Sequence, residues 1–353
     1  MSYSSLGTSP DQNSIETFEQ SENFDKESGQ FVNRRPGLIK EMHKRMFNLK
    51  MLKDWLGGQS HRVPKEKLPS VRPNLEEFKK DPERLKLVWF GHSTFLLNVE
   101  GKMVLFDPVF SGSASPLPFV VSRFQEPALS LEELPEIDYI VISHDHYDHL
   151  DMKSIKFFVN KKAIFITPLG VGSHLQGWGI EANRIEEKDW WDSYVADGIR
   201  FIATPAQHFS GRKGVDGNKT LWASWVVQSA NHNIYFSGDS GYDEHFKSIG
   251  EKLGPFDIAF LENGQYNEMW KEVHLLPEDT LKAFEDLNAS RLFPVHWGMF
   301  NLSFHSWFDP IDEIYSLTKE KNYKLVSPVM GQVVDVKADI EFDTWWKSLR
   351  PVE

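Results

Sequence analysis

One short run of the sequence, residues 143–149, combines three histidines with carboxylates at a spacing that suits metal binding. It reads SHDHYDH and follows the continuous apolar stretch DYIVI. In an extended loop, His144 and His146 point to the same side and can bind one cation, because side chains two residues apart share a face. Asp148 and His149 come at the turn into the next segment and can bind a second cation, as in two-metal sites. We therefore predict a metal centre here rather than a polar surface loop.

A metal centre of this kind needs further donors, and three later residues are positioned to supply them. His208 follows RFIATPAQ, Asp239 lies in SGDSG after NIYF, and His296 follows RLFPV. Each is a polar residue at the end of an apolar run, which is where open sheets place their sites. A lone histidine after a strand is commonly solvated or capped. The prediction therefore depends on all three occurring together with the first cluster.

The composition limits the chemistry that is open to this chain. Its 353 residues are enough for one large domain or two. It has no cysteine, which excludes disulfides, iron–sulfur clusters, thiolate zinc sites and a cysteine nucleophile. Any metal must therefore be bound by His, Asp or Glu. The net charge of −12 disfavours binding to nucleic-acid phosphates, so we expect no nucleic-acid partner.

Charge is unevenly distributed along the chain and suggests three segments. Residues 1–33 have a net charge of −5 and are rich in Ser, Asn and Gln. We expect them to be flexible and to lack a core of their own. Residues 34–67 have a net charge of +7. We predict a basic N-terminal extension over 34–84 and the main domain over 85–353.

The basic extension contains apolar residues at helical spacing over 38–56, with lysines on its other faces. Two interpretations are open. The helix packs on its own domain and leaves its lysines in water, or it forms a surface that meets anionic lipid head groups or an anionic substrate. The second interpretation predicts peripheral membrane contact through 38–56.

The sequence has neither the basic and apolar regions of a secretory signal at its N-terminus nor a run of about 18 apolar residues. We therefore expect a cytoplasmic protein, with membrane association only through the basic helix.

From Leu85 the pattern changes to short β-type runs with helical segments between them. Strands are predicted at 85–90, 93–99, 102–107, 138–143, 162–167, 199–204, 221–228, 233–238, 257–262, 291–295, 323–326 and 332–336, and helices at 152–160, 243–250 and 278–287. Because strands dominate and helices intervene, we predict two sheets covered by helices.

The order of the motifs resembles that of the metallo-β-lactamase superfamily. The motifs are HDHYDH at 144–149, PAQH at 205–208, SGDSG at 237–241 and PVHWG at 294–298. GHSTFLL, DPVFSGSASP and PAQHF further resemble one branch, the phospholipase D that hydrolyses N-acylphosphatidylethanolamine and its bacterial relatives. The ascorbate-6-phosphate lactonase-like proteins are a neighbouring branch. The resemblance covers residues 85–336.

The resemblance implies a four-layer αββα sandwich, an α+β fold in which two mixed sheets are flanked by helices. It also implies two divalent cations, zinc in the phospholipase branch, while manganese or iron also suits a donor set of nitrogen and oxygen. A hydroxide between the cations would be the nucleophile. The implied ligands are His144, His146 and His208 for the first metal, Asp148, His149 and His296 for the second, and Asp239 bridging both.

Other polar residues are predicted to assist at this site. Asp107 follows KMVLF and either orients a ligand histidine or forms a turn before Pro108. By the resemblance, His92 and His274 lie near the reaction centre and could protonate a leaving group, and with Asp148 they are the predicted catalytic residues. Of the other histidines, His305 is a candidate pocket residue, and His43, His61, His174, His232 and His245 are expected at the surface.

Two enzymatic functions are compatible with this site. The favoured one is hydrolysis of a phosphodiester, in particular a lipid such as N-acylphosphatidylethanolamine. The alternative is lactonase or other carbonyl hydrolysis of a small anionic sugar. An apolar pocket beside 38–56 would favour the lipid, and a small closed polar pocket with Arg or Lys would favour the sugar. Ribonuclease Z-type activity is disfavoured by the acidic segment 68–353, and a non-catalytic scaffold by the fact that every implied ligand is present.

Overall fold

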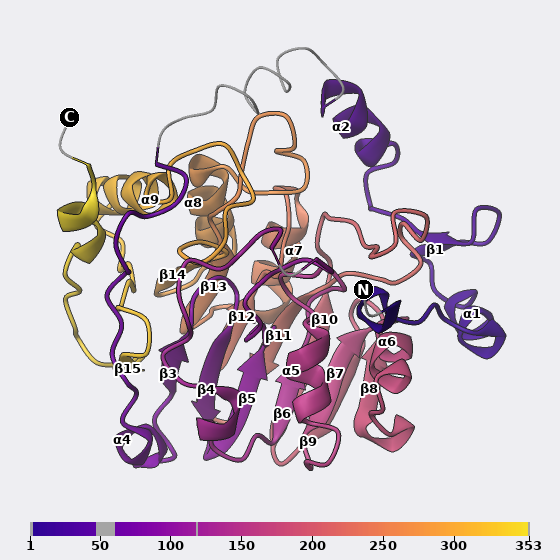
Figure 1. The fold of residues 1–353 in the computed structure, drawn as a ribbon, viewed down its shortest axis with the longest axis horizontal. Helices are drawn as coiled ribbons and strands as arrows, with labels where there is room; N and C mark the ends of the chain where they lie inside the picture. The colour runs from indigo at the N-terminus through magenta and orange to yellow at the C-terminus, as the bar shows by residue number, and fades with distance from the viewer. Residues whose placement is uncertain (1–2, 47–60, 118, 352–353) are drawn as a thin grey trace.

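The fold is built on two β-sheets that pack face to face (Figure 1). The computed structural model describes residues 3–46, 61–117 and 119–351. The first sheet has seven strands in the order β15-β3-β4-β5-β6-β7-β8. These strands are β3 (Lys86–Trp89), β4 (Phe95–Val99), β5 (Lys102–Phe106), β6 (Tyr139–Val141), β7 (Ile164–Pro168), β8 (Ile185–Lys188) and β15 (Val333–Asp335).

The second sheet has six strands in the order β14-β13-β12-β11-β10-β9. These strands are β9 (Ser193–Ala196), β10 (Ile199–Thr204), β11 (Ser224–Gln228), β12 (Asn233–Phe236), β13 (Ile258–Glu262) and β14 (Leu292–Val295). Both sheets are mixed. Strands β5 to β8 pair in parallel in the first sheet, and β12 to β14 do so in the second.

Helices cover the outer face of each sheet. They are α5 (Met152–Phe157) and α6 (Gly172–Gly177) on the first sheet, and α7 (His245–Leu253), α8 (Pro277–Asp286) and α9 (Asp309–Glu320) on the second. Ile155 and Leu175 pack with the first sheet in one apolar cluster. Phe246 and Ile311 pack with the second sheet in the main core. The result is the predicted αββα sandwich.

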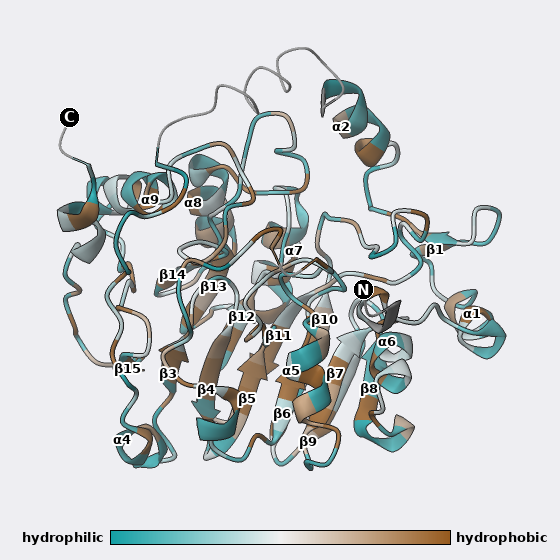
Figure 2. Cartoon of the chain, in the orientation of Figure 1, coloured by the Kyte–Doolittle hydropathy of each residue, from teal (hydrophilic) through white to brown (hydrophobic). Residues whose placement is uncertain are grey.

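The side chains of β4 show how the two apolar clusters are separated. Phe95, Leu97 and Val99 face the second sheet, whereas Leu96 faces the covering helices. Successive side chains of a strand point to opposite faces, so a strand with both faces covered is apolar at nearly every position. Figure 2 shows this arrangement as hydrophobic strands between helices with hydrophilic outer faces. The continuous apolar runs of the sequence are therefore central strands.

The loops that carry the predicted ligands meet at one edge of the two sheets. Parallel strands end at the same edge, and the pairing of Phe106 with Val141 aligns the ends of β5 and β6. The pairing of Glu262 with Val295 does the same for β13 and β14. The residues that follow these strands therefore lie side by side.

The N-terminal residues pack onto the main domain. Their elements are η1 (Tyr3–Leu6), α1 (Gln12–Phe18), β1 (Phe24–Asp25) and β2 (Gln30–Phe31). Phe18, Phe24 and Phe31 have ring centroids 5.1 to 5.9 Å apart and belong to the main core. The segment 1–33, which we expected to be flexible and without a core, thus contributes three phenylalanines to the core of the domain.

Helix α2 (Leu38–Met46) forms the first part of the helix predicted over 38–56, and residues 47–56 lie outside the described residues. Leu38 and Met42 are buried against Val273, whereas Lys40 and Lys44 are exposed. The two apolar side chains therefore face the domain and not a lipid surface. The lysines face solvent, as both interpretations of this helix require.

Some elements differ from the predictions. The strand predicted at 323–326 is wrong, because only an isolated bridge joins Leu325 to Leu292 there. Strands β8 and β9 and helices α6 and α9 were not predicted. Among the described residues, no helix is long and apolar enough to cross a membrane. The remaining short elements are α4 (Leu75–Lys79), η2 (Leu131–Glu133), η3 (Ala182–Arg184) and η4 (Trp345–Leu349).

Candidate metal centre

The implied ligands of the first metal form one compact group. His144 and His146 extend from the loop after β6, and His208 lies in the loop after β10. Nε2 of His144 lies 2.9 Å from Nδ1 of His146, and Nε2 of His208 lies 3.2 Å from that same atom. Each residue offers a nitrogen within 4.8 Å of the others. Three imidazole nitrogens this close together can bind one cation.

The implied ligands of the second metal gather beside His92. Oδ2 of Asp148 lies 3.5 Å from Nε2 of His149 and 3.0 Å from Nε2 of His92. These residues and His296 offer ligand atoms within 4.8 Å of one another. The structure thus places His92, predicted as a proton donor, in hydrogen-bond contact with the carboxylate of Asp148.

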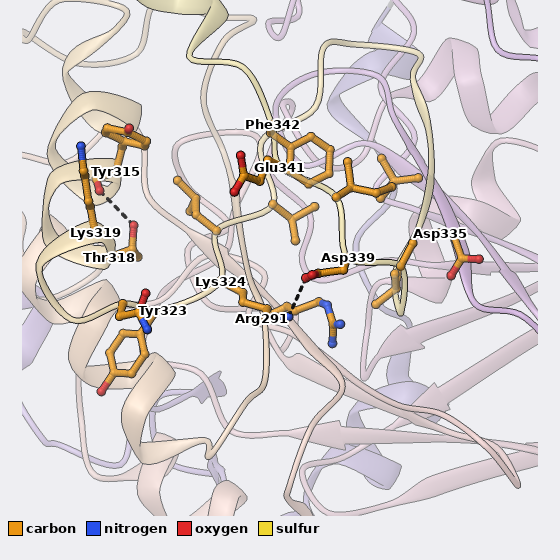
Figure 3. A pocket seen from close by; sticks show the side chains of 17 residues that line it. Arg291, Tyr315, Thr318, Lys319, Tyr323, Lys324, Asp335, Asp339, Glu341 and Phe342 are labelled. Atoms are coloured by element: carbon orange, nitrogen blue, oxygen red, sulfur yellow. Dashed lines mark hydrogen bonds and ion pairs between the residues drawn. The ribbon is translucent and has the colours of Figure 1, made fainter.

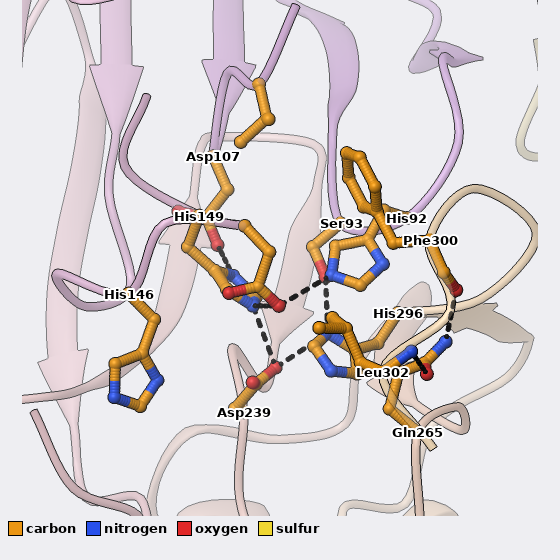
Figure 4. A network of polar contacts seen from close by, with 12 residues as sticks. His92, Ser93, Asp107, His146, His149, Asp239, Gln265, His296, Phe300 and Leu302 are labelled. Atoms are coloured by element: carbon orange, nitrogen blue, oxygen red, sulfur yellow. Dashed lines mark hydrogen bonds and ion pairs between the residues drawn. The ribbon is translucent and has the colours of Figure 1, made fainter. Parts of the chain in front are cut away.

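Asp239 lies between the two groups, and each of its oxygens faces one of them. Oδ1 lies 3.2 Å from Nε2 of His149 and 3.0 Å from Nδ1 of His296. Oδ2 lies 3.8 Å from Nε2 of His144 and 3.7 Å from Nε2 of His208. Figure 4 shows Asp239 pointing toward His149, which lies in a loop of the first sheet, and toward His296, which follows a strand of the second sheet as Asp239 does. This is the position that a bridging ligand needs.

Asp107 orients His149 from behind. Its Oδ2 lies 2.7 Å from Nδ1 of His149 (Figure 4). Its two oxygens also accept hydrogen bonds from the backbone N–H and the hydroxyl of Ser143. All three residues are buried. Because Nδ1 of His149 is engaged by Asp107, its Nε2 points to Asp239 and the interior of the site. Of the two interpretations of Asp107, the structure supports the orienting one.

His208 is held by the backbone of another loop. Its Nδ1 lies 3.0 Å from the carbonyl oxygen of Val273, a group that can only accept a hydrogen bond. Nδ1 therefore carries the proton, and the lone pair of Nε2 is directed toward His146. This tautomer is the one that can bind a metal through Nε2.

His274 lies at the rim of the site and pairs with a carboxyl group that the sequence analysis missed. Its Nδ1 lies 2.8 Å from Oε2 of Glu262, which is fully buried at the end of β13. Oε1 of Glu262 accepts hydrogen bonds from the backbone N–H groups of Ser240 and Leu275. The rule that predicted Asp239 and His296, a polar residue at the end of an apolar strand, would also have found Glu262.

The electrostatics of the site keep most of its histidines neutral. Burial lowers the pKa of His144, His208 and His296 well below the usual value, and the neighbouring histidines lower it further. His149 is different. Burial alone would lower its pKa, but Asp239, Asp148 and Asp107 raise it well above the usual value. The negative charge that holds a proton on His149 would equally attract a cation in its place.

The two ligand carboxylates have opposite shifts. Burial raises the pKa of Asp239 to about 7, although His149 opposes this rise. Burial would also raise the pKa of Asp148, but the adjacent His149 and His92 hold it well below its usual value.

The donor atoms fit a bound divalent cation. Nε2 of His149 and Oδ1 of Asp239 are buried and find no hydrogen-bond partner in the part of the chain that the structure describes. Buried polar atoms are costly unless they are paired, and a cation between them would satisfy both. The donors are all nitrogen and oxygen, which suits zinc, iron or manganese.

Three histidines expected at the surface are buried, which corrects the prediction. His174 lies 3.2 Å from Asp145, His232 lies 2.9 Å from the carbonyl oxygen of Glu83, and His245 lies 3.3 Å from the hydroxyl of Ser240. Each lies near a polar group brought close by the fold, which no local pattern reveals. His43 is exposed and His61 partly exposed, and His305 stacks on Tyr266 with centroids 4.6 Å apart.

Several cavities lie outside the ligand group, and two of them differ clearly in their lining. One of about 430 Å³ is lined by charged and aromatic residues of α9 and of 322–342, including Lys324, which pairs with Asp339 (Figure 3). It contains none of the predicted site residues. The other, of about 900 Å³, lies between α2 and the loop 209–218. Phe209 lines it, and the ring of Phe209 lies 4.7 Å from those of His146 and His208.

The comparisons with known proteins agree with this geometry. Residues 102–297, more than half of the chain, match the family described as the Beta-lactamase superfamily domain. The chain belongs to the beta-lactamase superfamily. The resemblance read from HDHYDH and the later motifs is thereby confirmed. As a superfamily member with relatives named as hydrolases, the protein is a metal-dependent hydrolase.

Curated relatives match most of the length of this chain. An uncharacterised protein of Mycobacterium tuberculosis is 39% identical over 334 residues, which is 93% of this chain and 88% of that protein. The N-acyl-phosphatidylethanolamine-hydrolyzing phospholipase D 1 of Caenorhabditis elegans is 36% identical over 264 residues, 69% of this chain and 74% of that enzyme.

Solved structures support the fold of this beta-lactamase superfamily member. An isothiocyanate hydrolase from Delia radicum gut bacteria has a TM-score of 0.56 at 19% identity and covers 70% of this chain and 98% of its own. Igni18, a metallo hydrolase from Ignicoccus hospitalis, has a TM-score of 0.55 at 21% identity. The match covers 71% of this chain and 97% of Igni18. At these identities the likeness concerns the fold and not the substrate.

Proposed function

We propose that this protein is a phosphodiesterase of the phospholipase D type that acts on N-acylphosphatidylethanolamine-like lipids with two divalent cations, most readily zinc. The relative in Caenorhabditis elegans supports the substrate class. The observation that carries the proposal is the cavity of about 900 Å³ beside α2. Phe209 lines this cavity, and its ring contacts the rings of His146 and His208.

The lining of this cavity combines apolar and cationic side chains. Ile39 and Phe209 supply apolar surface, and Lys40, His43 and Lys44 lie along its α2 side. Apolar contact suits an acyl chain, and lysines near a surface attract anionic phosphate or lipid head groups. The apolar side of this cavity, with Ile39 and Phe209, differs from the small closed polar pocket that would favour a sugar lactone. The basic helix is then part of the route by which the lipid reaches the site.

The chain's own residues can supply the acid–base chemistry. Bound cations would act as Lewis acids and lower the pKa of a coordinated water. Burial raises the pKa of Glu262 well above its usual value, so Oε2 keeps its proton and donates it to Nδ1 of His274. Nε2 of His274 then carries a proton that it can give to the leaving oxygen while the proton of Glu262 moves to Nδ1.

The bond changes follow from this arrangement. The oxygen of water bonds to phosphorus, and the bond from phosphorus to the N-acylethanolamine oxygen breaks. The leaving oxygen takes its proton from His274, and one proton of the attacking water returns to Glu262, so that both residues are restored at the end of the cycle. The products are phosphatidate and N-acylethanolamine.

The test is a substrate panel with the purified protein reconstituted with zinc. We expect release of N-acylethanolamine and phosphatidate from N-acylphosphatidylethanolamine, measured by mass spectrometry, and hydrolysis of bis-p-nitrophenyl phosphate as a soluble phosphodiester. A lactone series serves as the comparison. Hydrolysis of lactones with no turnover of either phosphodiester would overturn the proposal.

A further inference from the structure

The segment 5–9 near the N-terminus lies directly on the residues that support the ligand loop, residues 143–149. A Cβ added to Gly7 would lie 2.2 Å from Nδ1 of His174, and one added to Gly177 would lie 2.0 Å from the hydroxyl of Thr8. Such contacts are far below van der Waals distance. Both glycines are therefore needed for the segment and helix α6 to approach this closely.

His174 connects this segment to the ligand loop through a single fixed tautomer. The backbone N–H of Thr8 donates to Nδ1 of His174 at 3.0 Å, so Nδ1 must be the unprotonated nitrogen. Nε2 then carries the proton and donates it to Oδ2 of Asp145 at 3.2 Å. Asp145 stands between the implied ligands His144 and His146, and its other oxygen accepts the backbone N–H of Gly211.

Arg212 makes a second, independent connection between the same two segments. One of its terminal nitrogens donates to the carbonyl oxygens of Asp145 and Leu150. These two residues lie on either side of the implied ligands His146, Asp148 and His149 in the sequence. The other donates to the carbonyl oxygen of Ser5 at 2.8 Å. The guanidinium, which is 5% exposed, also lies 3.9 Å from the ring centroid of Tyr147. These partners together fix the position of the buried Arg212 side chain.

We infer that segment 5–9 is a positioning element for the metal centre, which acts through His174 on the side chain of Asp145 and through Arg212 on the backbone of the ligand loop. The contacts that connect the segment to the site are those with His174 and Arg212. The segment holds Asp145, and thereby fixes the direction in which His144 and His146 point. The inference rests on the proposed metal centre and is independent of the substrate.

The first test concerns His174 and uses Co²⁺ as the probe, titrated into the metal-free protein and followed by its visible absorption. His174→Ala removes both the acceptor and the donor, and we expect the Co²⁺ dissociation constant to rise about 10–100-fold. His174→Gln offers one acceptor and one donor, and should restore most of the affinity. Equal affinity of His174→Ala and wild type would overturn the inference, as would a loss in His174→Gln as large as that in His174→Ala with both variants folded.

The second test leaves His174 in place and perturbs only the segment. Gly7→Ala drives a methyl group into the imidazole, whereas Gly198→Ala makes the same substitution at nearly the same φ, +77° against +76°, where no described atom lies within 4 Å. We expect weaker Co²⁺ binding in Gly7→Ala alone, with both metal-free variants folded, as cooperative thermal unfolding of each would show. Equal Co²⁺ affinities of these two variants would contradict the inference. A wild-type protein that binds no Co²⁺ would instead overturn the metal centre itself.

Discussion

Asp107 makes a charged contact with His149, since its Oδ2 lies 2.7 Å from Nδ1 of the imidazole. Asp107→Asn keeps an oxygen acceptor but removes the negative charge that makes the imidazole a stronger ligand. We expect this change to weaken binding of the second cation about 10–100-fold. Competition with a chelator of known affinity measures the effect. Asp192→Asn, at an exposed position, is the control, and an Asp107→Asn variant that binds as tightly as this control would contradict the orienting role.

Metal binding should weaken as the pH falls. Burial raises the pKa of Asp239 to about 7, and the surrounding carboxylates raise that of His149 well above its usual value. A cation must displace these protons, so the lower the pH, the stronger the competition. We expect the apparent dissociation constant to rise about tenfold or more per pH unit below about pH 7. Isothermal titration at several pH values measures this slope, and a dissociation constant that does not change with pH would refute proton displacement.

At the residue level, the sequence predicted which side chains would meet but not how they are supported. The ligand positions were predictable because each follows an apolar strand, and the ends of such strands converge. His174 was not, because a lone histidine in a short helix between two glycines carries no local signal. Its partners Thr8 and Asp145 are 166 and 29 residues away in the sequence, and only the fold brings them together.

Helix α2 is the element whose role is most open to experiment. Lys40 and Lys44 are exposed on the side that lines the cavity, while Leu38 and Met42 attach the helix to the domain. We expect Lys40→Gln with Lys44→Gln to reduce turnover of vesicle-borne N-acylphosphatidylethanolamine several-fold, since each lysine near an anionic surface contributes about 1 kcal/mol. Hydrolysis of bis-p-nitrophenyl phosphate should be unchanged, because the ligands are untouched.

The control replaces two exposed lysines far from the cavity, Lys161→Gln with Lys162→Gln. This variant has the same change in net charge and should keep full turnover on vesicles. Equal losses in the two double variants would show that only overall charge matters. A loss on both substrates in the α2 variant would point to a folding defect instead.

Elements with strong periodicity were predictable, and those without it were not. The central strands of both sheets are apolar on both faces, so their runs stand out. Strand β8 (Ile185–Lys188) has the sequence IEEK, which has no apolar pattern. It is a strand because it pairs with β7 at the edge of the first sheet. Helix α6 (Gly172–Gly177) begins and ends with glycine, a poor helix former, because Gly177 must let Thr8 approach.

At the scale of the whole molecule, the N-terminal residues fold together with the main domain. Their composition, which is polar on average, did not indicate this. Phe31 is fully buried in the main core, whereas its neighbour Val32 is 40% exposed. We expect Phe31→Ala to lower the free energy of unfolding by about 3–5 kcal/mol. Val32→Ala should change it by about 0.5 kcal/mol or less. Urea denaturation measures both, and similar small values would show that the segment does not stabilise the domain.

We propose that the edge between the two sheets binds two divalent cations that share Asp239, whose two oxygens face the two histidine groups. The most direct measurement is native mass spectrometry of the metal-free protein titrated with Zn²⁺. We expect two bound ions per wild-type chain and a loss of tight binding at both positions in Asp239→Ala. A wild-type chain that saturates with one ion or none, or an Asp239→Ala variant that still binds two, would contradict it.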